Sequence, residues 1–137
     1  MSRIKNQYEL VKNQVEKAEK LFEDEGMLPE ALMNIFAIFE NCANLLKDVK
    51  NHFPKSKHYK VNEILSDLYR RKILNQDYTA YHSQLNDYRV IALFGEYSRE
   101  KKPLPPKASL RSYLKKATEL FRETKPQIES YLKKQKS

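Results

Sequence analysis

Glycine, cysteine and tryptophan are scarce in this chain. Its 137 residues include two glycines, six prolines, one cysteine and no tryptophan. So few glycines argue against a β-rich fold, because tight turns between strands commonly require glycine. The single cysteine, Cys42, excludes an internal disulfide, and its place in an apolar pattern predicts a buried, inert thiol. A chain of this length can bury a core large enough for one domain.

Long apolar runs are also missing. No stretch approaches the roughly 20 apolar residues that a membrane-spanning helix needs. The N-terminal segment from Met1 to Gln7 lacks the apolar core of a signal peptide. We therefore expect a cytoplasmic protein that does not associate with a membrane.

The residue types that commonly build catalytic centres lack supporting spacing. His52, His58 and His82 show neither the Glu-x-x-His nor the His-x-x-x-His spacing of a metal site in a helical bundle. There is no glycine-rich loop to hold the phosphates of a nucleotide. A lone cysteine without a helical histidine partner also disfavours a thiol nucleophile. The sequence predicts no metal and no cofactor, and it argues against most familiar enzyme classes.

Apolar residues recur at spacings of three and four along most of the chain, as in amphipathic helices. Asp77 is placed to cap the fourth expected helix, and Ser109 is placed to cap the last one. The pattern predicts an all-α protein with a single domain over residues 1–137, folded as one antiparallel bundle of four to five helices. The expected helices cover residues 4–22, 29–49, 57–72, 78–94 and 109–135.

Proline marks two further features of the C-terminal part. Three prolines within residues 101–107 predict an extended surface loop, because proline cannot continue a helix. Pro126 falls inside the last expected helix, which either kinks there or restarts after Thr124.

Basic residues are concentrated at the C-terminal end. The formal charge is +8, and residues 98–137 hold 12 basic against 4 acidic residues, whereas residues 1–97 hold 14 of each. Such asymmetry favours an acidic partner, which is RNA, DNA or an acidic protein surface. Lys115 and Lys116 are candidate contacts to that partner. A lysine-rich helix face that meets only solvent accounts equally for this pattern.

Arg89 is a lone cation in an otherwise apolar expected helix. Such a residue must reach solvent, find a partner or take part in function. His82, Asn86 and Arg89 follow at spacings of four and three, so they share one helical face. Arginine suits phosphate and histidine exchanges protons near neutral pH, so this strip can bind or cleave a phosphodiester. The alternative is a solvated face on which Arg89 pairs with Glu40 or Asp87.

Several tyrosines lie near Arg89 in the sequence. Tyrosines that are exposed beside basic groups can stack on nucleic-acid bases. Tyrosines at helical spacing also serve as core or interface residues whose hydroxyl reaches water. The four tyrosines concerned are Tyr78, Tyr81, Tyr88 and Tyr97.

The order of these segments resembles the HEPN superfamily of small α-helical bundles, found in prokaryotic toxin–antitoxin, defence and nucleotidyltransferase-associated systems. A long first helix precedes a helix from Glu30 to Leu46, then comes a variable third helix, the run from Arg89 to Tyr97, a loop and a last long helix. The resemblance covers nearly the whole chain. It implies the bundle fold and a homodimer.

The HEPN signature is an arginine followed four to six residues later by a histidine. In family members that act as ribonucleases, the two residues help to cleave RNA without a metal. Arg89 matches the arginine and Gly95 and Tyr97 suit the pattern, but Val90 replaces the usual polar residue and Phe94 stands at the histidine position. Phenylalanine cannot exchange a proton, so the resemblance does not extend to the family's acid–base chemistry at this position.

The sequence therefore favours a non-catalytic, HEPN-like module that binds RNA or a partner protein, such as a nucleotidyltransferase-like protein, in a toxin–antitoxin or defence-type system. Arg89, Asn86 and Tyr97 would line its groove, with Glu40 as the partner of Arg89. One alternative is a metal-independent ribonuclease that uses Arg89 with His82. A second alternative is a purely structural protein-interaction bundle.

Overall fold

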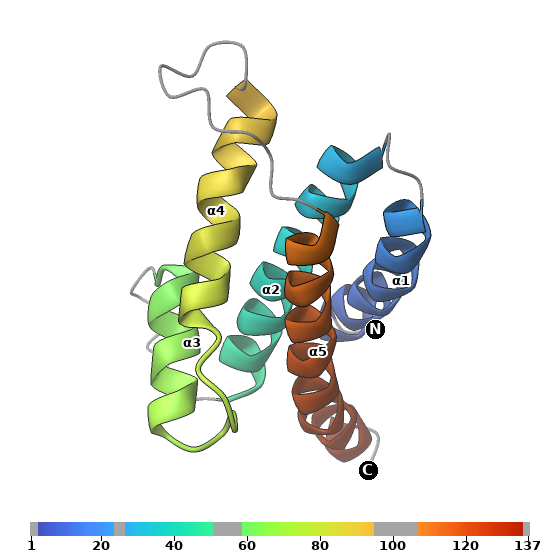
Figure 1. The fold of residues 1–137 in the computed structure, drawn as a ribbon. Helices are drawn as coiled ribbons and strands as arrows, with labels where there is room; N and C mark the ends of the chain where they lie inside the picture. The colour runs from blue at the N-terminus through green and yellow to red at the C-terminus, as the bar shows by residue number, and fades with distance from the viewer. Residues whose placement is uncertain (1–2, 24–26, 51–58, 95–106, 136–137) are drawn as a thin grey trace.

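The computed structural model describes residues 3–23, 27–50, 59–94 and 107–135, excluding the side chains of Val90 to Phe94. This part of the chain forms helices and no strand, which confirms the all-α prediction. Figure 1 shows α3 and α4 on one side of α2, with α1 and α5 on the other. The helices are α1 (Arg3–Glu23), α2 (Leu28–Val49), α3 (Val61–Arg70), α4 (Thr79–Phe94) and α5 (Lys107–Gln135).

Helix α2 is the centre of the bundle and packs against the other four helices. Its apolar residues form a stripe wide enough to face neighbours on both sides, as a central helix requires. Cys42 is buried in this core, and burial raises the pKa of its thiol to about 12, which leaves the thiol protonated and unreactive. The fully buried side chains of α2 include Leu32, Ile35, Ile38, Phe39, Leu45 and Leu46.

The start of α4 is fixed by polar contacts as well as by packing. The carboxylate of Asp77 accepts a hydrogen bond of 3.0 Å from the backbone N–H of Thr79, the first residue of α4. The N-cap lies one residue later than predicted, at Tyr78, because the carbonyl of Tyr78 accepts the first hydrogen bond of the helix, from the N–H of His82. The ring of Tyr78 is buried, and its hydroxyl donates a hydrogen bond to Glu123 of α5. Glu123 also accepts from the backbone N–H of Asn75, so one carboxylate ties the turn before α4 to α5.

Helix α3 is shorter than the predicted 57–72. It begins at Val61, after Lys60 in an extended conformation, and it ends at Arg70; residues 57 and 58 lie outside the described part. Lys72 has a φ of 62°, in the left-handed region. The N–H groups of Lys72 and Ile73 bond to the carbonyls of Tyr69 and Leu68, which is the Schellman pattern that ends a helix. Lysine at the position where glycine is usual explains why the sequence pattern missed this ending.

Replacing Lys72 with glycine is expected to stabilise the protein by about 0.5–1 kcal/mol. Glycine removes the roughly 1–2 kcal/mol that a side chain costs in the left-handed region, and part of that gain is offset by the greater freedom of glycine in the unfolded chain. Urea unfolding measures the difference. Arg71→Gly is the matched control. Arg71 has a φ of −83°, which any residue adopts, so glycine brings no gain there and this variant should be less stable than the parent. If the Lys72→Gly protein is no more stable than the parent, the left-handed conformation of Lys72 does not lower the stability of the protein.

Helix α5 begins two residues before its predicted start and runs without interruption through Pro126. The predicted loop included Lys107, but α5 begins there, since lysine and alanine are strong helix formers, and Ser109 lies within the helix instead of capping it. The helix continues through Pro126, with no restart after Thr124. Pro126 is exposed, so the backbone hydrogen bond that a proline cannot donate is missing on the solvent side of α5. On the other side, buried Leu120, Thr124 and Ile128 hold α5 against the core.

None of the helices described is long and apolar enough to cross a membrane.

Candidate functional site

A groove of about 440 Å³ lies where α2, α3 and α4 meet. It contains His82, Asn86 and Arg89 of α4, so the predicted polar strip does share one face. Glu40 of α2, also singled out from the sequence, lines the same groove. The remaining polar residues of its lining are Asn44, Lys47, Tyr59, Lys60 and Asn62.

Phe36 of α2 is the apolar support of this site. The ring of His82 stacks on it, with centroids 4.9 Å apart and an interplanar angle of 24°. The guanidinium of Arg89 lies 4.8 Å from the centre of the same ring, which is the geometry of a cation–π contact. The sequence pattern identified Phe36 only as one of the apolar core residues of its helix. Phe36 lies one turn before Glu40 on the same helical face, and this spacing could have indicated that Phe36 borders the site.

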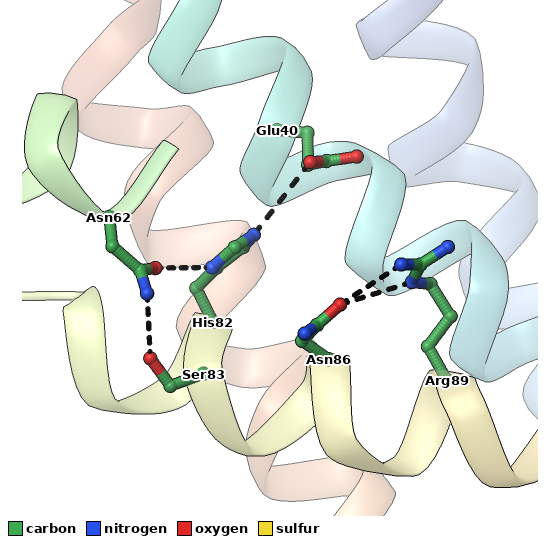
Figure 2. Close-up of polar contacts among 6 residues, drawn as sticks. All are labelled: Glu40, Asn62, His82, Ser83, Asn86 and Arg89. Carbon is green, nitrogen blue, oxygen red and sulfur yellow. Dashed lines mark hydrogen bonds and ion pairs between the residues drawn. The ribbon is translucent and has the colours of Figure 1, made fainter. Parts of the chain in front are cut away.

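Arg89 is held by its own helix. Its Nε and Nη2 groups donate to the Oδ1 atom of Asn86, at 3.2 and 3.1 Å. The hydrogen-bond partner of Arg89 is thus Asn86, one turn away on the same helix, and Glu40 interacts with Arg89 through its charge (Figure 2). The charge of Arg89 still acts on Glu40: burial raises the pKa of that carboxyl, and the nearby cation opposes the rise.

His82 is the residue that Glu40 faces. The Nε2 atom of the ring lies 3.9 Å from Glu40 Oε2, and Nδ1 contacts the Oδ1 atom of Asn62 in α3 (Figure 2). The Asn62 amide nitrogen donates to the hydroxyl of Ser83 at 3.0 Å. His82 is only 7% exposed, and its buried Nε2 atom has no hydrogen-bond partner. Burial, followed by the charge of Arg89, lowers the pKa of His82 to about 4, so the ring is neutral at pH 7.

The two lysines predicted as contacts lie elsewhere. Lys116 of α5 donates to the side chain of Gln76 at 2.8 Å, pairs with Glu119 at 3.2 Å and lies 5.4 Å from the ring centre of Tyr81. Its charge is therefore used to join α5 to α4. Lys115 is exposed on α5, and neither lysine lines the groove.

The tyrosines near Arg89 pack within the bundle. Tyr78 is part of the buried core, and Tyr81 and Tyr88 each meet the ring of Tyr113 in α5 edge-on, with centroids 6.4 Å apart. These contacts match the core-and-interface alternative. The predictions for Gly95 and Tyr97, and for the side chains of Val90 and Phe94, lie outside the described residues.

The lining of the groove has a clear chemical character. Lys47, Lys60 and Arg89 bring three cations, and Glu40 brings one carboxylate. In the described ranges, no three His, Cys, Asp or Glu side chains gather closely enough to hold a metal ion. The site is thus suited to an anionic ligand with hydrogen-bonding groups. Comparisons of the chain with protein-family models, with curated proteins and with solved structures give no match.

Proposed function

We propose that this protein is a non-catalytic, HEPN-like module that binds single-stranded RNA in the groove at Arg89. The observation that carries the proposal is the convergence of Arg89, Lys47 and Lys60 on one groove whose lining includes a single carboxylate, that of Glu40. Cations gathered around hydrogen-bonding side chains suit a phosphate backbone, because phosphate contacts supply most of the affinity for nucleic acid.

Arg89 is prepared for this role by its surroundings. A guanidinium offers five N–H donors in a planar fork that matches a phosphate, and Asn86 takes two of them. Stacking on Phe36 and bonding to Asn86 fix the side chain before a ligand arrives. Less conformational entropy is then lost on binding, so each contact contributes more affinity.

The groove also favours a single strand over a duplex. Its volume of about 440 Å³ falls at the small end of the range for ligand pockets. It opens between three helices, and its lining includes the side-chain amides of Asn44 and Asn86, which carry hydrogen-bond donors as well as acceptors. Sequence-specific contacts to RNA are made mostly to unpaired bases that present such edges.

The ribonuclease alternative depends on His82. Its Nε2 atom is buried without a partner and its Nδ1 atom is held by Asn62, an arrangement that also orients catalytic histidines. However, a pKa of about 4 makes this imidazole a weak base at pH 7, and cleavage needs an acid as well as a base. Binding is therefore the function that these residues favour.

Substituting Arg89 tests the proposal. Arg89→Ala should weaken binding of a labelled single-stranded RNA by at least about tenfold, since a charge-assisted phosphate contact is lost. Binding is measured by fluorescence anisotropy at about 50 mM salt, where phosphate contacts are strongest. Lys133→Ala and Arg122→Ala, which remove exposed cations from α5, are the matched controls and should change the affinity far less.

The outcomes separate the alternatives. Equal losses in all three variants would indicate general electrostatic attraction instead of a site. A protein that binds no RNA at low salt would favour the protein-interaction alternative. Cleavage of RNA in the presence of EDTA that disappears in His82→Ala would replace the binding proposal with the ribonuclease. The HEPN resemblance adds a homodimer and a toxin–antitoxin setting, and the first of these is tested by a solution mass of twice 16.3 kDa.

A further inference from the structure

The basic residues of α5 take no part in the groove, whose lining comes from α2, α3, α4 and the residues just before α3. The whole excess of positive charge nevertheless lies in residues 98–137. Four exposed cations of α5 follow at spacings of 4, 7 and 11 residues, close to one, two and three full turns, so they form one line along the helix. At 1.5 Å per residue this line is about 33 Å long. We call these four residues the basic face: Arg111, Lys115, Arg122 and Lys133.

The charges of the basic face are not neutralised within the protein. Among the described residues none of the four cations forms an ion pair, whereas the neighbouring Lys116 pairs with Glu119 at 3.2 Å on the side of α5 that faces α4. The guanidinium of Arg111 lies 4.9 Å from the centre of the Phe22 ring, and this cation–π contact holds it in place. The basic face therefore presents a row of positive charges to an anionic partner.

The apolar side of α5 is already used by the core. Its three aromatic rings, those of Tyr113, Phe121 and Tyr131, pack against the core instead of lying on the basic face. Single-stranded nucleic acid is commonly held by stacking on exposed aromatic rings, and a membrane-surface helix needs an exposed apolar side. The basic face offers neither contact. The buried residues of the opposite side are Leu110, Ala117, Leu120, Thr124 and Ile128.

Glu129 interrupts the row of cations between Arg122 and Lys133. It is exposed, lies 4.0 Å from the ammonium of Lys125, and accepts a hydrogen bond of 2.8 Å from the hydroxyl of Tyr8. A carboxylate at this point repels a uniformly negative surface, such as a phosphate backbone or an anionic bilayer. A protein can place a neutral or basic side chain opposite Glu129 and acidic side chains opposite the cations, so the pattern favours a protein partner.

A hollow of about 560 Å³ lies beside the C-terminal half of the basic face. Proline is unfavourable inside a helix, and because Pro126 is exposed the core does not require it there. Pro126 has no N–H, so the helix offers the carbonyl of Arg122 no donor at this position. A concave surface that includes apolar side chains suits one apolar anchor of a partner. The residues that line the hollow are Pro126, Glu129, Ser130, Leu132 and Lys133.

We infer that the basic face is the docking surface for an acidic amphipathic helix of a partner protein. Carboxylates of that helix meet the four cations, and one apolar side chain fills the hollow. A second helix supplies the same spacings, because its own residues 4, 7 and 11 apart also share one side. Charged pairs between two helices set the choice of partner and its orientation. The basic face and the groove lie on different helices, so this inference is independent of RNA binding.

Two synthetic peptides test the docking surface. Each is labelled and has about 25 residues, enough to span the basic face as a helix. The first carries glutamates at every third or fourth position, which form one side of a helix, with a leucine near each end and alanine and glutamine elsewhere. The second has the same composition, with its glutamates distributed around the helix. Fluorescence anisotropy should show that the first peptide binds at least about tenfold more tightly, because only its charges match the line of cations.

Charge reversals assign the binding to α5. Arg122→Glu and Lys133→Glu should each weaken binding of the first peptide by at least about tenfold, since each replaces an attraction with a repulsion. Arg70→Glu is the matched control: it makes the same change of charge at an exposed residue of α3, where Arg70 lies 3.8 Å from Asp67. This variant should keep the affinity of the parent. The three positions are exposed, and urea unfolding checks that each variant folds.

Each result bears on the inference. Equal binding of the two peptides, or equal losses in Arg122→Glu and Arg70→Glu, would indicate attraction by net charge and overturn it. Binding of neither peptide would also overturn it. If Arg122→Glu weakens RNA binding as much as Arg89→Ala does, the basic face belongs to a nucleic-acid site instead. Peptide binding that persists in Arg89→Ala supports the inference, and it would do so even if the protein bound no RNA.

Discussion

Lowering the pH from 7 to 4 is expected to remove about 3 kcal/mol of folding stability through His82 alone. Burial, with a smaller contribution from the charge of Arg89, lowers the pKa of His82 from 6.5 to about 4. Each pKa unit corresponds to about 1.4 kcal/mol of difference between the two protonation states. His82 is only 7% exposed, so solvent screens this effect little.

The direction of the effect follows from proton binding. Between pH 6.5 and about 4 the unfolded chain takes up a proton at this histidine and the native protein does not. Stability rises with pH wherever the unfolded state binds more protons, so it is lost as the pH falls through this range. Glu40 acts in the opposite direction, because burial raises the pKa of its carboxyl and the native state holds that proton more tightly.

Comparison with His82→Phe isolates the histidine. Urea unfolding of both proteins at pH 7, 5.5 and 4 gives the difference in their free energies of unfolding at each pH. Glu40 and all other titrating groups are common to the two proteins, so their contributions largely cancel. The difference should move by about 3 kcal/mol in favour of the variant between pH 7 and pH 4. Parallel pH profiles would show that His82 titrates as it does in the unfolded chain.

The helices were predictable where their signals are local. The stripe of apolar residues placed α1 and α2 to within one residue at their described ends, because both helices bury one continuous face. The end of α3 was not predictable in this way. It depends on Lys72 in a left-handed conformation, and the usual sequence signal for that conformation is glycine.

The groove was predictable on one helix but not between helices. Spacing alone placed His82, Asn86 and Arg89 on one face, because positions on one helix are fixed by its geometry. Spacing says nothing about distances to other helices. The sequence analysis named Glu40 as a partner for Arg89, whereas the packing of α2 on α4 brings the Glu40 carboxylate toward His82. Asn62 was missed for the same reason, since only the packing of α3 against α4 brings it to the ring.

Replacing Phe36 is expected to have the largest effect of any single substitution in the groove. Phe36 is 6% exposed, and Phe36→Ala should destabilise the protein by about 3–5 kcal/mol, since the deleted ring leaves a cavity in the core. Urea unfolding at pH 7 measures this loss. His82 and Arg89 both lie on the face of that ring, within 5 Å of its centre, so the same change removes the support of both.

Replacing Phe36 with leucine distinguishes its role in positioning Arg89 and His82 from its role in the stability of the core. Phe36→Leu keeps an apolar side chain but loses the aromatic surface on which Arg89 and His82 rest, and RNA affinity should fall by at least about tenfold. Phe39→Leu is the matched control on the same helix, because Phe39 is fully buried against Tyr78 and does not line the groove. It should lose comparable stability and keep its RNA affinity. Equal affinities in the two leucine variants would mean that Phe36 serves the core alone and that Arg89 is positioned sufficiently by Asn86.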